Sequence, residues 1–199
     1  MARGRPRKID PETVLDAIMM TFWQHGYLDT TMSQLTQATN MAKPGLYAAF
    51  GDKEALFKTA IKQYNHVVAK PMLDDICHSN DELICVFTRY LDRVASTVLN
   101  PLGPKGCLAA NSLVQCPTMS DELNQLSKAE HEYRRKVFLE RLTLAKDKGE
   151  LSNQSDPESL SHFIAGQVLA ITVMARAGAD KATLDQLIQV AMASLSRHP

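Results

Sequence analysis

The chain has 199 residues, of which 45% are hydrophobic and 22% charged, and its 22 basic and 22 acidic side chains give a formal net charge of zero. This composition is typical of a globular protein with one domain, or a small domain joined to a larger one, and excludes a disordered chain. The longest apolar run, FIAGQVLAITVMA at 163–175, is shorter than the roughly 20 residues that a membrane-spanning helix needs. We therefore expect a cytoplasmic protein without a membrane segment.

The four cysteines, at positions 77, 85, 107 and 116, show no C-x-x-C spacing, and no paired histidines accompany them. We accordingly expect no metal site and no cofactor. The basic N-terminus is not followed by the apolar stretch of a secretory signal. Free thiols are the expected state in a reducing cytoplasm.

Helical periodicity runs through nearly the whole chain with no convincing strand pattern, which predicts an all-α fold. A first helix is predicted to begin after Asp10, with Pro11 at its first position, and to end at Gly26. A short helix follows, in which Thr31 is the N-cap and Gln34, three positions later, completes the pattern of a capping box.

The next elements complete a helix-turn-helix. Asn40 tolerates positive φ and is expected to end the second helix. A third short helix is predicted over 42–50, with Pro44 in its first turn, and a fourth from Asp52 to about Pro71. Two short helices joined by a tight turn, and supported by a longer helix, are the elements of this DNA-binding motif.

A cluster of cationic side chains precedes this unit, in ARGRPRK at 2–8: Arg3, Arg5, Arg7 and Lys8. The arrangement is that of the arm with which homeodomain-type proteins enter the minor groove, where Arg is attracted to narrow A·T-rich DNA. A phosphate clamp without sequence preference and a solubilising disordered tail are the alternatives.

Beyond residue 80, amphipathic helices are predicted at about 81–99, 105–114, 119–148, 156–177 and 180–196. The fourth of these is apolar almost all round and must be covered on all sides. We predict that it and the last helix form a four-helix interface with a second copy. The expected domains are a DNA-binding domain over 1–52, including the basic arm, and an effector-binding and dimerisation domain over 53–199.

Residues 30–57, TTMSQLTQATNMAKPGLYAAFGDKEALF, resemble the DNA-binding signature of TetR-type transcriptional regulators. The matching positions are Thr30-Thr31, Leu35, Met41, Lys43, Leu46-Tyr47, Phe50, Lys53-Glu54 and Leu56-Phe57, and FWQHGY at 22–27 matches the first-helix ending. The resemblance implies a homodimer that binds a palindromic operator on double-stranded DNA and is released by a small ligand. Asn40 replaces the turn Gly of the family, and Ala42 replaces the usual Ser, which removes a side-chain N-cap worth about 1 kcal/mol.

The third helix carries no Arg, Asn or Gln, so it lacks the bidentate donors that recognise guanine and adenine edges. Lys43, Tyr47 and Lys53 are expected to contact phosphates, and Gly45 to permit close approach to the groove. Pro44 and Ala48 are expected to meet thymine methyl groups. Specificity would then depend on the arm, on the second helix and on DNA shape. The candidate contacts in that second helix and at its start are Thr31, Ser33 and Gln34. Core packing is the alternative for Tyr47.

An effector cavity lined by Phe87, Tyr90, Phe163 and Gln167 is expected among the middle helices, with ordinary core packing as the alternative. Cys107 lies at a predicted helix start, where a thiol pKa falls, and GCL resembles electrophile- and oxidant-responsive members of the family. It is therefore a candidate sensor thiol, with a small buried hydrophobe as the alternative.

These patterns predict a dimeric, ligand-responsive repressor, not an enzyme, whose two helix-turn-helix units lie about 34 Å apart. Two other functions stay open: a thiol-dependent redox enzyme using Cys107, and an architectural DNA-binding protein without an effector. Activation instead of repression is also open, and the sequence names neither operator nor effector.

Overall fold

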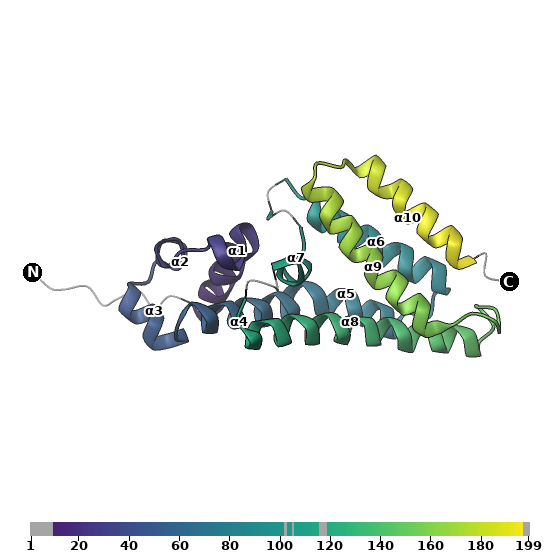
Figure 1. The fold of residues 1–199 in the computed structure, drawn as a ribbon, viewed down its shortest axis with the longest axis horizontal. Helices are drawn as coiled ribbons and strands as arrows, with labels where there is room; N and C mark the ends of the chain where they lie inside the picture. Colours follow the sequence, from purple (N-terminus) through teal and green to yellow (C-terminus); the bar gives the residue numbers. More distant parts are fainter. Residues whose placement is uncertain (1–9, 102, 105, 116–118, 197–199) are drawn as a thin grey trace, which may run out of the picture. The chain divides into compact units, whose positions relative to one another are not determined.

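A computed structural model of the chain describes residues 10–101, 103–104, 106–115 and 119–196. All regular elements in this part of the chain are helices, which confirms the predicted all-α fold (Figure 1). They are α1 (Pro11–Asp29), α2 (Met32–Thr39), α3 (Lys43–Phe50), α4 (Lys53–Tyr64), the π-helix η1 (Asn65–Ala69), α5 (Lys70–His78), α6 (Leu83–Val98), α7 (Leu108–Gln115), α8 (Asp121–Asp147), α9 (Pro157–Arg176) and α10 (Lys181–Ser196).

The helices form two compact units that meet at the Tyr64–Asn65 bond, later in the chain than the predicted boundary at residue 52. The reason is that α4 completes the core of the first unit by packing on α1. The rings of Phe22 and Phe57 meet edge to face at 5.1 Å, and those of Trp23 and Tyr64 at 4.8 Å. The first unit would lose this aromatic core without α4.

The turn chemistry of the first unit follows the sequence closely. The N–H of Gln34 donates to Thr31 Oγ1 at 3.2 Å and the N–H of Thr31 donates to Gln34 Oε1 at 2.7 Å, so the predicted capping box is formed. Asn40 ends α2 in the left-handed region, at φ 52° and ψ 30°. Gly26 also has positive φ, 77°, but it interrupts α1 instead of ending it, since the helix resumes as far as Asp29.

The predicted end of the fourth helix near Pro71 is wrong, because helical structure continues from α4 through η1 into α5. Proline lacks an N–H, and its ring clashes with the carbonyl four residues earlier, here that of Val67. The chain accommodates this conflict with the wider turn of η1 and then resumes an α-helix at Lys70. The proline therefore changes the pitch of the helix without ending it.

Beyond α5, the second unit is built from helices that agree with the predicted ranges to within three residues at each end. Phe87 and Tyr90 of α6 pack edge to face on Phe138 of α8, with ring centres 5.7 and 5.2 Å apart. By length and composition alone, α9 is the one helix in the described part of the chain that could cross a membrane. It packs against α6, α8 and α10 and buries Ile164 and Val168, as the core helix of this unit (Figure 1).

Candidate nucleic-acid interface and effector cavity

Helix α3 is almost entirely exposed. Among its eight residues only Leu46 is fully buried, at 0% exposure. The predicted contact residues of this helix all lie on the surface: Lys43, Pro44, Gly45, Tyr47 and Ala48. Tyr47 is 40% exposed, which rules out core packing as its role. The Nζ atom of Lys43 lies 5.8 Å from the centre of the Tyr47 ring, so the cation and the aromatic ring occupy the same patch.

The start of α3 is open. Ala42 occupies the N-cap position with φ −66° and ψ 145°, and no side chain caps the helix, as the sequence predicts. The first-turn N–H groups of a helix are free to bind water or a phosphate when no side chain takes them. A Cβ added to Gly45 would meet only Met41 Cε, at 3.9 Å, so packing inside the unit does not require glycine there. The missing side chain instead leaves room for another molecule at this surface.

Three of the predicted DNA contacts, Thr31, Gln34 and Lys53, are engaged within the unit. Gln34 Oε1 accepts from both the N–H and the hydroxyl of Thr31, at 2.7 and 2.8 Å, so the oxygen of its side-chain amide is used in the capping box. Lys53 Nζ donates to the carbonyl of Leu28 at 3.1 Å and lies 4.8 Å from the Tyr27 ring. Burial lowers the pKa of Lys53, and the charge of Asp29 opposes the change. Lys53 thus fastens α4 to the end of α1.

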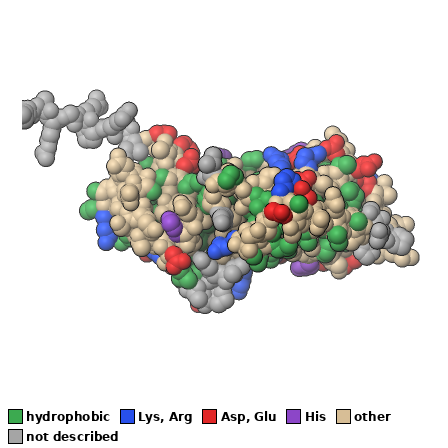
Figure 2. Space-filling model, turned by 90° about the horizontal axis from the view of Figure 1, so that it is seen from above, with side chains coloured by type: hydrophobic (Ala, Val, Ile, Leu, Met, Phe, Trp, Pro, Cys, Tyr) green, Lys and Arg blue, Asp and Glu red, His purple; other side chains and the backbone are tan. Residues whose placement is uncertain are grey.

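The basic arm residues Arg3, Arg5, Arg7 and Lys8 lie outside the described residues. Ser33 is exposed on α2. On the second unit, in the view of Figure 2, Lys and Arg side chains lie among Asp and Glu side chains. Mixed charge of this kind matches a chain with 22 basic and 22 acidic residues, so the arm remains the most concentrated positive segment of the sequence.

The residues predicted to line an effector cavity are scattered. Phe87 and Tyr90 are 0% and 3% exposed and belong to the ring cluster around Phe138, whereas Phe163 is 36% exposed on α9. Gln167 is half-buried on the same helix. Burial raises the pKa of Tyr90 to about 12, so its phenol stays protonated at neutral pH. Ordinary core packing therefore accounts for the two α6 aromatics.

Cys107 lies at the start of α7, where its carbonyl accepts from the N–H of Asn111 at 2.8 Å. Its side chain is only 6% exposed, which favours the alternative of a small buried hydrophobe, because buried thiols are usually inert. Cys77 and Cys85 are exposed instead. Burial raises the pKa of Cys77, and the charges of Glu140 and Asp74 act in the same direction.

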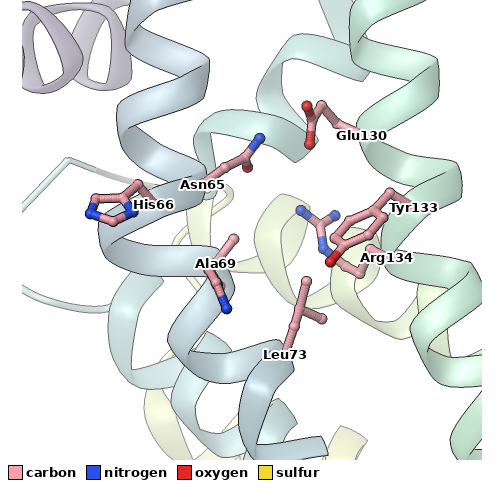
Figure 3. A pocket seen from close by; sticks show the side chains of 8 residues that line it. Asn65, His66, Ala69, Leu73, Glu130, Tyr133 and Arg134 are labelled. Carbon is pink, nitrogen blue, oxygen red and sulfur yellow. The ribbon is translucent and has the colours of Figure 1, made fainter. Parts of the chain in front are cut away.

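The second unit contains a cavity of ≈ 180 Å³ between η1 and α5 on one side and α8 on the other (Figure 3). Its lining residues are Asn65, His66, Ala69, Lys70, Leu73, Glu130, Tyr133 and Arg134. None of them was predicted from the sequence. The helical pattern of α8 places its many charged residues on a solvated face, so it does not indicate a cavity. The one feature of the sequence that could have indicated the cavity is Pro71, because a proline at that position predicts an irregular helix.

Two family models match the chain: "Bacterial regulatory proteins, tetR family" over residues 14–60, and "Tetracyclin repressor-like, C-terminal domain" over residues 83–191. The HTH-type transcriptional repressor ComR of Escherichia coli (strain K12) is 28% identical over 199 residues, covering 100% of this chain and 93% of ComR. The HTH-type regulator YezE of Bacillus subtilis (strain 168) is 24% identical over 193 residues, covering 96% of this chain and 99% of YezE.

Among solved structures, a cysteine mutant of the TetR family transcriptional regulator CifR, complexed with 26-bp double-strand operator DNA, superimposes with a TM-score of 0.85. It is 26% identical in sequence, and the match covers 96% of this chain and 99% of the other. The similarity therefore extends over both units and is not confined to the helix-turn-helix.

Proposed function

The chain belongs to the TetR family of bacterial transcriptional regulators, and on that premise we propose that it is a homodimeric repressor released from a palindromic operator by a small-molecule effector. The family and the relatives named above are DNA-binding regulators and not enzymes, which removes the redox-enzyme alternative. The observation that carries the proposal is the exposed surface of α3, whose one buried side chain is Leu46.

On DNA, α3 is the element that enters the major groove. Lys43 and Tyr47 contact phosphates, and the free N–H groups at the start of α3 add a further phosphate site. Pro44 and Ala48 meet thymine methyl groups, with Gly45 allowing close approach. The arm follows the minor groove, and Ser33 and Thr31 lie on the α2 side of the contact. Because Lys53 is bonded to Leu28, its phosphate contact is the weakest part of this arrangement.

Dimerisation is proposed through α9 and α10, each of which exposes apolar surface. Val173 of α9 is 52% exposed and Val190 of α10 is 70% exposed. Gly166 of α9 is also exposed, and nothing lies within 4 Å of a Cβ added there, so another helix can approach closely. A second copy of the chain is the expected partner, because a palindromic operator needs two α3 helices about one DNA turn apart.

The effector is proposed to bind without forming a covalent bond, within the second unit. Release requires that the effector binds more tightly to the form of the dimer that does not fit DNA. An electrophile or oxidant acting at Cys107 has less support, since that thiol is 6% exposed. As a DNA-binding regulator of this family, the protein is expected to act in the cytoplasm.

Selection of bound duplexes from a randomised DNA library tests the proposal and does not require a known operator. We expect enrichment of one palindromic sequence. The slope of log K against log salt should fall by about 0.9 for each phosphate that an Arg3→Ala, Arg5→Ala, Arg7→Ala variant no longer neutralises. Lys136→Ala, an exposed change on α8, is the matched control and should leave the slope unaltered. Recovery of sequences with no common motif would instead support the architectural alternative.

A further inference from the structure

The cavity in the second unit has the size and lining of a small-molecule site. Its volume, ≈ 180 Å³, is comparable with the roughly 150 Å³ of an engineered cavity that holds benzene in another protein. Ala69 and Leu73 supply an apolar wall, whereas Asn65 and Tyr133 supply groups that can donate hydrogen bonds. In Figure 3, the guanidinium of Arg134 projects from α8 into the space that faces η1.

Arg134 brings a buried cationic group to the lining of this cavity. Arg134 is 5% exposed, so its interactions are poorly screened by water. The other cation, Lys70, is 62% exposed and its Nζ lies 2.6 Å from Asp74 Oδ2, which neutralises it locally. The one carboxylate of the lining, Glu130, is only partly buried and keeps much of its hydration. Next to Arg134 in the sequence, burial lowers the pKa of His131 and the charge of Arg134 lowers it further, whereas the charge of Glu132 opposes the change.

We propose that this cavity is the effector site and that it takes a small organic carboxylate. The guanidinium of Arg134 holds the carboxylate, and the hydrocarbon body of the ligand lies against Ala69 and Leu73. Arginine suits this task because its planar donors match the two oxygens of a carboxylate. The release of DNA by this ligand rests on the proposed function, whereas binding of the carboxylate does not.

The position of the cavity connects it to the helix that begins in the DNA-binding unit. Three lining residues, Asn65, His66 and Ala69, belong to η1, which follows α4 directly in the chain. Single π-helical turns inside α-helices occur frequently at functional sites, and this turn exists because Pro71 prevents a regular α-helix. A carboxylate held by Arg134 and bonded to Asn65 favours one geometry of η1. The ligand would therefore bind more tightly to the form of the protein that has this geometry, as release from DNA requires.

Binding is tested on the full-length protein with sodium benzoate as the probe. Benzamide, which has the same shape without the charge, and sodium chloride at equal ionic strength are the controls. We expect benzoate to raise the melting temperature and benzamide to leave it unaltered. Arg134→Met should abolish the shift. Glu130→Gln should lower the Kd for benzoate, because it removes a negative charge from the cavity, at a site that is only partly buried.

Three results would overturn the carboxylate assignment. The first is the absence of a benzoate shift, and the second is an equal shift with benzamide. The third is stabilisation by benzylammonium that is abolished in Glu130→Gln, since that would make the cavity a cation site. The Glu130→Gln variant still decides between the two assignments if Arg134→Met fails to fold. Loss of the negative charge should lower the Kd for an anion such as benzoate and raise the Kd for a cation such as benzylammonium.

DNA release is measured separately, on the duplex selected from the random library. Benzoate should raise the Kd of the native protein for that duplex by about fivefold or more, and should have no effect on Arg134→Met. A melting shift without any change in DNA affinity would refute the effector role and leave the repressor intact. Failure to select any DNA would refute the proposed function, while the melting experiment would still decide the carboxylate site.

Discussion

The uncapped start of α3 allows a stabilising substitution to be predicted from geometry. Ala42 has the extended backbone of an N-cap residue, φ −66° and ψ 145°, but no side-chain oxygen to accept from the first turn. Its side chain is exposed, so serine fits without displacing a neighbour. Replacing alanine by serine at an N-cap contributes about 1 kcal/mol, which corresponds to about a fivefold change in a local opening equilibrium.

The assay is amide hydrogen exchange of the full-length protein in the absence of DNA. Ala42→Ser should slow exchange in α3 by about fivefold and leave α8 unaltered, since local opening is measured separately in each helix. Ala42→Val, which adds volume but no oxygen, is the matched control and should give no protection. Equal protection by valine would refute the capping argument, and unaltered exchange in the serine variant would show that α3 opens only with the whole unit.

Other substitutions test the core, the dimer and the thiols. Phe57→Ala should destabilise the first unit by about 3–5 kcal/mol in urea unfolding, because Phe57 is 1% exposed and packs on two aromatic rings. A loss of stability below about 1 kcal/mol would contradict the role of Phe57 in the aromatic core. Val190→Glu should convert the proposed dimer to monomer in sedimentation analysis, whereas Leu144→Glu, at a 44% exposed site on α8, should not. A thiol reagent should label Cys85 rapidly and Cys107 only at the rate of local unfolding, and equally fast labelling would restore Cys107 as a sensor candidate.

The sequence predicted those features that depend on a few neighbouring residues. Thr31 and Gln34 form their capping box through contacts three residues apart, and Asn40 takes positive φ because its short side chain tolerates it. The same local rules do not say how a helix responds to a proline. Pro71 indicates a helix end, but the wider turn of η1 accommodates the proline and α5 follows directly.

The charged residues on α8 explain why the cavity was not predicted from the sequence. Arg135 looks like part of a solvated face, yet it is 8% exposed because Glu132 and Glu158 bond to it at 2.6 and 2.7 Å and Ser161 at 3.0 Å. Two of these partners come from α9, a separate helix further along the chain. No periodicity within α8 distinguishes a buried arginine such as Arg134 or Arg135 from an exposed one, so only the folded arrangement of the helices reveals the cavity.

The weak anchoring of α3 bears on how this protein recognises DNA. One buried side chain, Leu46, holds the helix to its unit, and its first turn lacks a side-chain cap. A DNA phosphate placed at that first turn would accept from the same N–H groups that a cap would satisfy. We therefore expect operator binding to complete the ordering of α3. Because the helix offers no bidentate donors, such ordering follows from backbone and phosphate contacts, and sequence preference must come mainly from the arm and from DNA shape.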